Sequence, residues 1–460
     1  MTRREGKAAT ARLRGLCAAI VAGVALHAAP VTANGRFPRA QFLTVGPGRA
    51  DELFLLRTTF GLLASDDGGQ HFRFYCEEAY QLPDGYDPMA AWASDGTLFV
   101  GSPTGLLTTR DLCDPSRRPE FEGQEVVDLA GDATGRTTLA SLQSRDATPV
   151  LRVARTEDGG RLWEVPREGF VGEIPLTVEV APSDGRRAYL TSVAWEGGAN
   201  TLRRSDDGGR TWRALGVRFE GRPYLAGVDP TRPDTVYVRV ELGLSFDGGT
   251  VTGGTALLRS DDGGDRFREV GRTRGPMLGF AVSDDGRHVW IGGPGDDDGL
   301  LRSDDGGAFE RVSPVGVDCL RWHAGALYAC ETLGGRMGTA LVSRSRDLGA
   351  TRAVMARLED VLPPPMRCPQ GSIVRGFCAD RWPVVRAMVL GQARGDGGVM
   401  DAAVGMDAAR DAGGGGGGSD GCDCRARPGR REGAGGWWAL AVGWAARRGR
   451  RRGSAPPPRR

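Results

Sequence analysis

One short motif recurs along this 460-residue chain and constrains its fold more than any other feature. The four best copies share an aspartate, a glycine pair and a later aromatic residue, and they read SDDGGQHF from Ser65, TEDGGRLW from Thr156, SDDGGRTW from Ser205 and SDDGGDRF from Ser260. Weaker copies, each with one residue lost or replaced, begin at Thr109, Ser303 and Ser345. A motif that returns at a nearly constant interval indicates a repeat protein.

The interval between copies suits one four-stranded blade of a β-propeller. The aligned aspartates lie 42 to 55 residues apart and are Asp67, Asp111, Asp158, Asp207, Asp262, Asp305 and Asp347. Most copies follow three strand-like runs and precede a fourth, such as FRFYC after the motif at Ser65 and LWEVP after the one at Thr156. We therefore predict an all-β fold, a single propeller of about seven four-stranded blades over residues 40–357.

The motif has a structural explanation in which it closes a turn. The aspartate accepts hydrogen bonds from turn amides, the glycine adopts a positive φ, and the aromatic residue, such as Trp163 or Trp212, packs between strands. Ligand binding by these aspartates is the alternative, and we favour the structural role because Asp-Gly turns commonly close hairpins.

The motif resembles the Asp-box (BNR) repeat, SxDxGxTW. The copy from Ser205 to Trp212 matches it at every position, and the resemblance covers about residues 40–357. Similar repeats occur in sialidases, xyloglucan-active glycoside hydrolases, sortilin-type receptors and photosystem II assembly factors. The resemblance therefore implies a propeller but does not imply one activity, because one fold supports many functions.

The first 33 residues have the pattern of a signal peptide. A basic segment with Arg3, Arg4 and Lys7 precedes an apolar run of about 14 residues and the small residues before Asn34. A transmembrane anchor is the alternative, but about 20 apolar residues are needed to cross a bilayer. We expect an exported protein that begins near Asn34.

Nine cysteines in an exported chain suggest disulfides. Proximity along the chain predicts the pairs Cys319–Cys330 within a blade hairpin and Cys76–Cys113 between neighbouring blades. It also predicts the pair Cys368–Cys378 in a loop after the propeller, residues 358–390. No cysteine pair has the spacing of a zinc site and histidines are few, so we expect no metal and no other cofactor.

The C-terminal part has the composition of a linker and a sorting tail. Residues 391–421 include six consecutive glycines, which predicts a flexible linker. Residues 422–460 hold Cys422 and Cys424, an apolar stretch over residues 435–446 and a cluster of arginines. This tail resembles the MYXO-CTERM signal, which implies processing at Cys422 or Cys424, a sorting protease and attachment to the cell surface or outer membrane. A basic tail that lies on anionic lipid is the alternative.

The charge distribution argues against nucleic acid as a partner. The formal net charge is +2, but both ends of the chain are strongly basic, so residues 34–424 carry an excess of acidic groups. Nucleic acids favour clustered cations instead. Contact with a membrane is expected only through the C-terminal tail.

No local catalytic motif is present, so we name no catalytic residue. No metalloprotease HExxH, hydrolase GxSxG or phosphate-binding GK[ST] sequence occurs. A pair of acids from distant blades could still meet at one face of the propeller, and the candidates near strand ends are Glu196, Asp229, Asp234 and Glu241. Two hypotheses remain open: a non-catalytic propeller that binds a protein or polysaccharide, and a secreted glycoside hydrolase.

Overall fold

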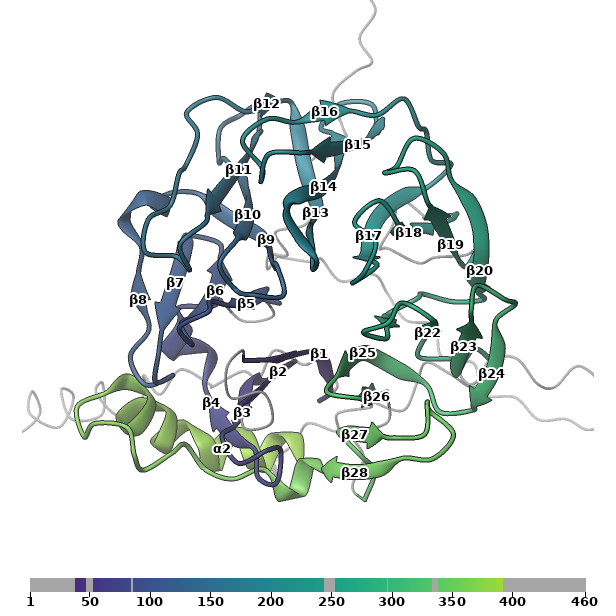
Figure 1. The fold of residues 1–460 in the computed structure, drawn as a ribbon. Coiled ribbons are helices and arrows are strands. Elements are labelled where there is room, and N and C mark those ends of the chain that lie inside the picture. Colours follow the sequence, from purple (N-terminus) through teal and green to yellow (C-terminus); the bar gives the residue numbers. More distant parts are fainter. Residues whose placement is uncertain are drawn as a thin grey trace, which may run out of the picture. The chain divides into compact units, whose positions relative to one another are not determined.

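The computed structural model describes residues 38–46, 53–83, 86–243, 253–295, 297–332 and 338–391. The predicted signal peptide, most of the linker and the sorting tail, including Cys422 and Cys424, lie outside these residues. Seven four-stranded antiparallel sheets stand around a central axis as the blades of a propeller (Figure 1). This confirms the predicted fold class and the number of blades.

The strands follow one another along the chain, blade by blade. Their bounds are β1 Ala40–Val45, β2 Phe54–Thr58, β3 Gly61–Ser65, β4 Arg73–Tyr75; β5 Ala90–Trp92, β6 Leu98–Ser102, β7 Gly105–Thr109, β8 Ser116–Arg117; β9 Glu125–Gly131, β10 Thr138–Gln143, β11 Val150–Thr156, β12 Phe170–Val171; β13 Glu173–Ala181, β14 Asp184–Ala194, β15 Asn200–Ser205, β16 Arg213–Ala214; β17 Arg222–Val228, β18 Val236–Glu241, β19 Thr255–Ser260, β20 Arg268–Thr273; β21 Gly279–Val282, β22 His288–Gly292, β23 Leu300–Asp304, β24 Glu310–Ser313; β25 Val317–His323, β26 Ala326–Glu331, β27 Val342–Ser345 and β28 Ala353–Ala356. Each blade therefore forms from a local stretch of chain.

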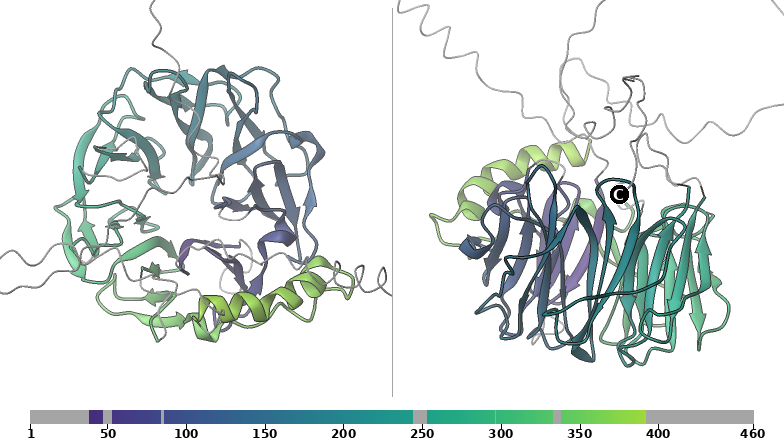
Figure 2. Two further views of the ribbon diagram at one scale, coloured as in Figure 1. Left: turned by 180° about the vertical axis from the view of Figure 1, so that it is seen from behind. Right: turned by 90° about the horizontal axis from the view of Figure 1, so that it is seen from above.

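The blades pack face to face around the ring (Figure 2). The second strands are the most apolar, and β6 and β26 are buried along almost their whole length. The blade interfaces form several hydrophobic clusters around the ring, as the alternating apolar positions of the strands require.

One predicted strand is wrong. The third blade was expected to end with LWEVP, residues 162–166, but its fourth strand is β12, eight residues further along. Within the expected segment Glu164 makes only an isolated bridge with Arg155. The Glu164 carboxylate also pairs with the Arg155 guanidinium at 2.6 Å, and strand pairing with β11 resumes at Phe170.

Residues 358–391 form a C-terminal clasp rather than the predicted loop. They contain the 3-10 helix η3 Leu358–Asp360, the π-helix η4 Val374–Cys378 and the α-helix α2 Ala379–Val389; the other short helices are η1 Glu77–Tyr80 and η2 Pro119–Phe121. The clasp lies along the outer edge of the first two blades (Figures 1 and 2). It packs there against the hydrophobic cluster of the first blade, and the Trp382 and Phe74 rings are 4.8 Å apart.

The clasp connects the two ends of the ring. No described blade mixes strands from the beginning and the end of the propeller, because the four strands of each sheet are consecutive. Instead, the Leu362 N–H donates to the Phe72 carbonyl at 2.9 Å, and the Phe74 N–H donates to the Leu362 carbonyl at 3.1 Å. These bonds extend the first blade with backbone that follows the seventh blade.

Two disulfides attach the clasp to the ring, and they correct the predicted pairing. Cys76 pairs with Cys378 and Cys113 with Cys368, whereas the predicted Cys319–Cys330 bond is present within one hairpin. The pairs Cys76–Cys113 and Cys368–Cys378 were wrong. The clasp runs across the outer ends of two blades, so its two cysteines reach different blades and cannot reach each other.

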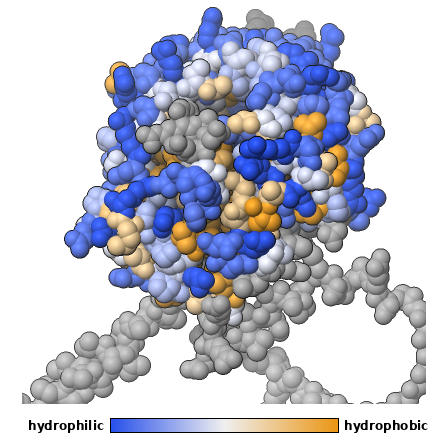
Figure 3. All heavy atoms as spheres, turned by 60° about the horizontal axis from the view of Figure 1, so that its bottom comes forward, coloured by the Kyte–Doolittle hydropathy of each residue, from blue (hydrophilic) through white to orange (hydrophobic). Residues whose placement is uncertain are grey.

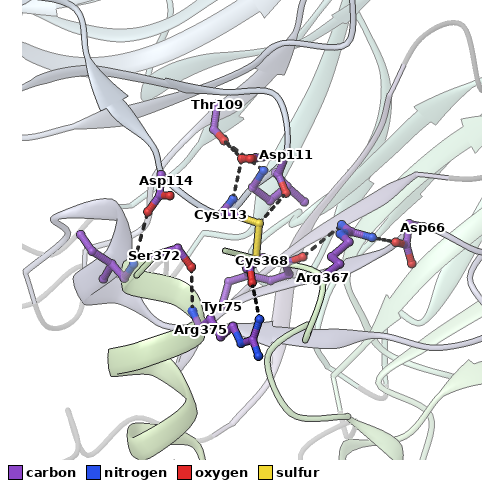
Figure 4. The surroundings of a disulfide bond; sticks show 12 residues. Asp66, Tyr75, Thr109, Asp111, Cys113, Asp114, Arg367, Cys368, Ser372 and Arg375 are labelled. Atoms are coloured by element: carbon purple, nitrogen blue, oxygen red, sulfur yellow. Dashed lines mark hydrogen bonds and ion pairs between the residues drawn. A yellow bond between two sulfur atoms is a disulfide. The ribbon is translucent and has the colours of Figure 1, made fainter. Parts of the chain in front are cut away.

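Figure 4 shows the surroundings of the Cys113–Cys368 bond. The Arg375 guanidinium donates to the Cys368 carbonyl at 3.1 Å, and the Ile373 N–H donates to the Asp114 carboxylate at 3.2 Å. The Arg367 guanidinium forms an ion pair with Asp66. These contacts fix the clasp at both sides of the disulfide.

The outer surface is mainly hydrophilic, with separate hydrophobic patches on the face that Figure 3 presents. Large exposed apolar side chains of the clasp include Met366 and Phe377. Within the described residues no helix is long and apolar enough to span a bilayer. Three disulfides are typical of proteins that fold outside the reducing cytosol, which fits an exported protein.

Candidate functional site: the central channel

The inner strands of all seven blades enclose a cavity of about 520 Å³ on the propeller axis. Aromatic side chains from four blades lie in its wall; they are Phe42, Trp92, Tyr224 and Phe280. Six charged residues also line it, namely Arg57, Asp128, Asp132, Glu179, Arg239 and Arg321. The volume falls in the range of ordinary small-ligand pockets.

The strand register identifies residues that lie at one level of the channel. In each blade, the first motif residue pairs with a second-strand residue, which pairs in turn with an inner-strand residue. The residue that directly precedes this inner-strand residue differs between the blades. It is small in five blades, where it is Thr44, Ala91, Ala130, Gly227 or Ala281. The other two blades carry Glu179 and Arg321. The sequence alone did not reveal this level, because the separation between the paired residues of the inner and second strands differs from blade to blade, as in Thr44–Leu55 and Arg321–Tyr328.

Asp128 of β9 is bound to the backbone of the next blade. One carboxylate oxygen accepts from the Leu129 N–H and the other from the Val178 N–H of β13, both at 2.9 Å. The side chain is almost fully buried, and this burial raises its pKa to about 7, against the effect of the two amides. Asp128 therefore links two inner strands as well as lining the channel.

Glu179 of β13 lies in the channel beside Asp128. Removal from bulk water and the neighbouring Asp128 charge raise the pKa of Glu179 to about 8, and the Arg321 guanidinium opposes this rise. No hydrogen bond or ion pair joins Glu179 to any described residue. Its carboxyl group is thus available to a ligand.

The arginines of the channel differ in how they are held. Arg239 lies 5.1 Å from the centre of the Tyr224 ring and donates to the Met277 carbonyl. Arg57 donates to the Pro88 carbonyl at 3.3 Å. Arg321 has no hydrogen-bond or ion-pair partner among the described residues, and desolvation lowers its pKa. Arg321 is therefore the guanidinium best placed to bind a ligand.

The four acids proposed from the sequence do not meet in this channel. Asp229 is fully buried and accepts from the Thr231 N–H at 2.9 Å and from the Arg232 guanidinium at 2.6 Å. Burial opposes ionisation of Asp229, but these bonds hold its pKa below the ordinary value. Asp234 forms an ion pair with Arg187 of the preceding blade. Both acids therefore serve the turn between β17 and β18.

The other two proposed acids are also separate from the cavity. Glu196 is exposed in the turn between β14 and β15. Glu241 ends β18, and burial raises its pKa. The four side chains are absent from the cavity wall, so they do not form a facing pair there.

Most motif aspartates have the hydrogen bonds of a closed turn. Asp207 accepts from the Ser205 hydroxyl at 2.8 Å and from the Thr211 N–H at 2.9 Å. Burial opposes its ionisation, but hydrogen bonds from Thr211 and Ser205 hold the pKa of Asp207 below its usual value. Comparable bonds are made by Asp67, Asp158, Asp262 and Asp347. Asp111 accepts from the Cys113 N–H in a tighter version of the turn.

Asp305 departs from the role expected for it. Its carboxylate pairs with the Arg287 guanidinium at 2.7 and 2.9 Å, while the Ser303 hydroxyl donates to the Gly307 carbonyl at 2.6 Å. This copy of the motif is one residue short. Asp305 itself adopts a φ of 51°, so its side chain does not face the turn amides.

The motif turns also pack against the preceding blade. Gly209 has a φ of 84°, and a Cβ there would lie 2.8 Å from the Leu139 side chain. The two aromatic residues proposed for packing are placed differently: Trp163 contacts Phe99 and Phe121 edge to face, whereas the Trp212 indole N–H donates to the Gly209 carbonyl at 3.1 Å. Each turn therefore joins two blades.

A repeated arginine makes a second link that the sequence analysis missed. It directly precedes the motif serine or threonine and donates to the fourth residue of the motif in the next blade. The three bonds are Arg155 to the Gly208 carbonyl at 2.8 Å, Arg204 to Gly263 at 3.2 Å and Arg302 to Leu348 at 3.2 Å. The signal was the arginine that recurs before the motif.

Among the residues that the structure describes, no group of three or more His, Cys, Asp or Glu side chains could hold a metal ion. Asp298, part of an acidic stretch, instead accepts from the Arg274 N–H at 2.7 Å and the Gly275 N–H at 3.0 Å. These bonds fix the loop between two blades.

No family model matches the chain, and no curated protein matches it. Solved propeller structures are similar to it. An ancestral GH74 enzyme aligns over 66% of this chain and 44% of its own length, with a TM-score of 0.50 and 15% identity.

Two further structures align less closely. The GH74 xyloglucanase from Xanthomonas campestris aligns over 68% of this chain and 64% of its own, with a TM-score of 0.33 and 14% identity. YCF48 bound to a D1 peptide aligns over 64% of this chain and 89% of its own, with a TM-score of 0.41 and 17% identity. This chain thus spans less than half of the ancestral GH74 enzyme, and at such identities the likeness supports a β-propeller fold and nothing more specific.

Proposed function

We propose that the protein is an exported, non-catalytic propeller that is held at the cell surface and binds a protein or polysaccharide partner. One observation carries the non-catalytic part. Of the three acids in the channel wall, Asp128 has both carboxylate oxygens bonded to backbone amides and Asp132 accepts from the Thr134 and Arg136 N–H groups, which leaves Glu179 as the acid without a partner. Hydrolysis of a glycosidic bond ordinarily needs two carboxyl groups that can both act on the substrate.

A secreted glycoside hydrolase is the second candidate, and one observation favours it. Burial raises the pKa of Asp128 to about 7, and burial together with the Asp128 charge raises the pKa of Glu179 to about 8. Raised carboxyl pKa values are a property of general acids in catalytic sites.

Exposure of the purified full chain to a panel of polysaccharides separates the two candidates, with retention and release of reducing sugar measured in parallel. We expect retention without release. Release of sugar that disappears in the Glu179→Gln variant would instead identify a hydrolase. If neither occurs, a protein partner is left as the ligand.

Surface attachment depends in this proposal on the C-terminal tail. Replacement of both Cys422 and Cys424 by alanine removes the proposed processing site. We expect the variant to lose its association with the cell surface when cells are fractionated, whereas a Cys319→Ser, Cys330→Ser variant, altered only within a blade, keeps it. Unchanged attachment of the tail variant would contradict this part of the proposal.

A further inference from the structure

The charges in the channel are separated across its width. The acids come from β9 and β13, in neighbouring blades, whereas Arg321 comes from β25 and Arg57 from the next blade around the ring. Figure 1 places β9 and β13 across the centre from β1 and β25. The wall formed by β9 and β13 therefore carries the acids and the facing wall carries Arg57 and Arg321, while Arg239 comes from β18, in the blade after β13.

Glu179 and Arg321 are the two residues that can bind a ligand from these walls. They lie at the same level, the five other residues of that level are small, and both side chains line the cavity. Neither side chain has a hydrogen-bond or ion-pair partner among the described residues.

A structural ion pair in the same blade provides a contrast. Arg203 contacts Glu173 through two hydrogen bonds of 2.6 Å, which satisfies both groups. Glu179 and Arg321 lack this pairing, although each is close enough to alter the proton affinity of the other.

We propose that the central channel binds a small zwitterion, a free amino acid or short peptide, with its ammonium group on Glu179 and its carboxylate on Arg321. A guanidinium binds a carboxylate through two parallel hydrogen bonds. The ammonium group neutralises the acidic wall, where two carboxyl groups repel each other. Phe42, Trp92, Tyr224 and Phe280 offer apolar contact to the rest of the ligand. This site goes beyond the proposed binding of a large partner, because the cavity admits only small molecules.

Ligand binding at this site should be coupled to the release of a proton. Glu179 faces Asp128 and Arg321, with Arg239 and Arg57 also near Asp128. With a pKa of about 8, the free Glu179 carboxyl is mostly protonated at pH 7. A bound ammonium group stabilises the ionised form of Glu179 over the protonated form. Binding therefore releases the Glu179 proton, which the buffer takes up.

Calorimetric titration of the full chain tests the proposal, with the twenty amino acids and trialanine as separate probes. We expect at least one probe to bind, with its N-acetyl and C-amide forms at least about tenfold weaker, because each loses a charge-assisted hydrogen bond. Titration at pH 7 in buffers of different ionisation enthalpy measures the proton release, which Glu179→Gln should reduce.

Variants at both walls complete the test. Arg321→Gln and Glu179→Gln each weaken binding by about tenfold or more, whereas Arg268→Gln, on the outer strand β20, leaves binding unchanged. The proposal is overturned if no probe binds, if the blocked forms bind equally well, or if Arg321→Gln binds like the original. Retention of a polysaccharide by the same preparation would show that the large-partner function stands even then.

Discussion

The motif aspartates illustrate how one residue type serves two purposes in the same repeat. Asp207 closes its turn by accepting hydrogen bonds from a backbone amide and two hydroxyls, but Asp305 forms a surface ion pair. The difference follows from one missing residue in the repeat at Ser303, which moves the carboxylate away from the amides.

These two aspartates give a matched pair of substitutions. We expect Asp207→Ala to lower the free energy of unfolding by about 1–3 kcal/mol, because the turn amide and hydroxyl lose their acceptor. Asp305→Ala should have a smaller effect, because exposed ion pairs contribute little. Urea denaturation measures both. Equal losses would mean that the turn bonds are not what stabilises the motif.

Glu179 gives the stability of the fold a pH dependence. Its pKa is raised to about 8 in the folded protein, so the folded state keeps a proton that the unfolded chain releases. Its stabilising contribution is complete below the ordinary carboxyl pKa and is lost as the pH rises through about 8.

Glu179→Gln removes the titrating group. The free energy of unfolding should therefore fall less between pH 5 and pH 9 in this variant. We expect a difference on the order of 1 kcal/mol, because water in the channel screens the charge. Denaturation of both proteins at the two pH values measures this difference. Asp128, whose pKa is about 7, contributes to the remaining fall, together with Glu125, Glu241 and Asp318, whose pKa values burial also raises. An identical fall in the two proteins would contradict the assignment to Glu179.

At the scale of elements, the blades are joined by contacts that recur with the motif. The turn of one blade packs on the preceding blade, and the arginine before each of three motifs bonds to the next turn. The clasp supplies the corresponding connection where the chain cannot continue, between its last and first blades.

The disulfides of the clasp should stabilise the fold more than the disulfide within a hairpin. Cys76–Cys378 and Cys113–Cys368 span 302 and 255 residues, whereas Cys319–Cys330 spans 11. In the chain-entropy description, a longer closed loop gives more stabilisation, about 5 kcal/mol for the longest loops against about 3 for a short one.

Thermal denaturation of the Cys368→Ser, Cys378→Ser variant should therefore show a lower Tm than that of the Cys319→Ser, Cys330→Ser variant. Limited proteolysis should also cut the clasp of the former within residues 358–391, since its backbone is no longer attached to both blades. Equal Tm values with a protected clasp would mean that apolar packing alone holds this segment.

At the scale of the whole molecule, closure of the ring depends on the segment after the last blade. A chain that ends at residue 357 contains every strand, but it exposes the apolar side chains that the clasp covers, among them Phe74 and Tyr80. We expect this truncated chain to unfold at a lower temperature than the full chain and to aggregate, because exposed apolar surface promotes association.

A chain that ends at residue 391 is the control for the truncation, since it keeps the clasp and both of its disulfides. Its Tm should equal that of the full chain, measured by calorimetry. If the chain that ends at residue 357 were equally stable, the clasp would have no part in closing the ring.

The sequence by itself determined the architecture, because each blade consists of four consecutive strands and its hydrogen bonds are local. A structural unit that forms from consecutive residues appears in the sequence as a regular repeat, and here the motif at the end of each third strand marks that repeat. The same locality made the Cys319–Cys330 bond predictable, since both cysteines lie in one hairpin.

Only the tertiary structure decided the partners of the other cysteines and the composition of the channel. Cys378 meets Cys76 because a helix carries the end of the chain back to the first blade. Glu179 and Arg321 line one cavity because seven separate strands place one residue each at the same level. Such placements depend on contacts between distant segments, for which local sequence patterns carry no signal.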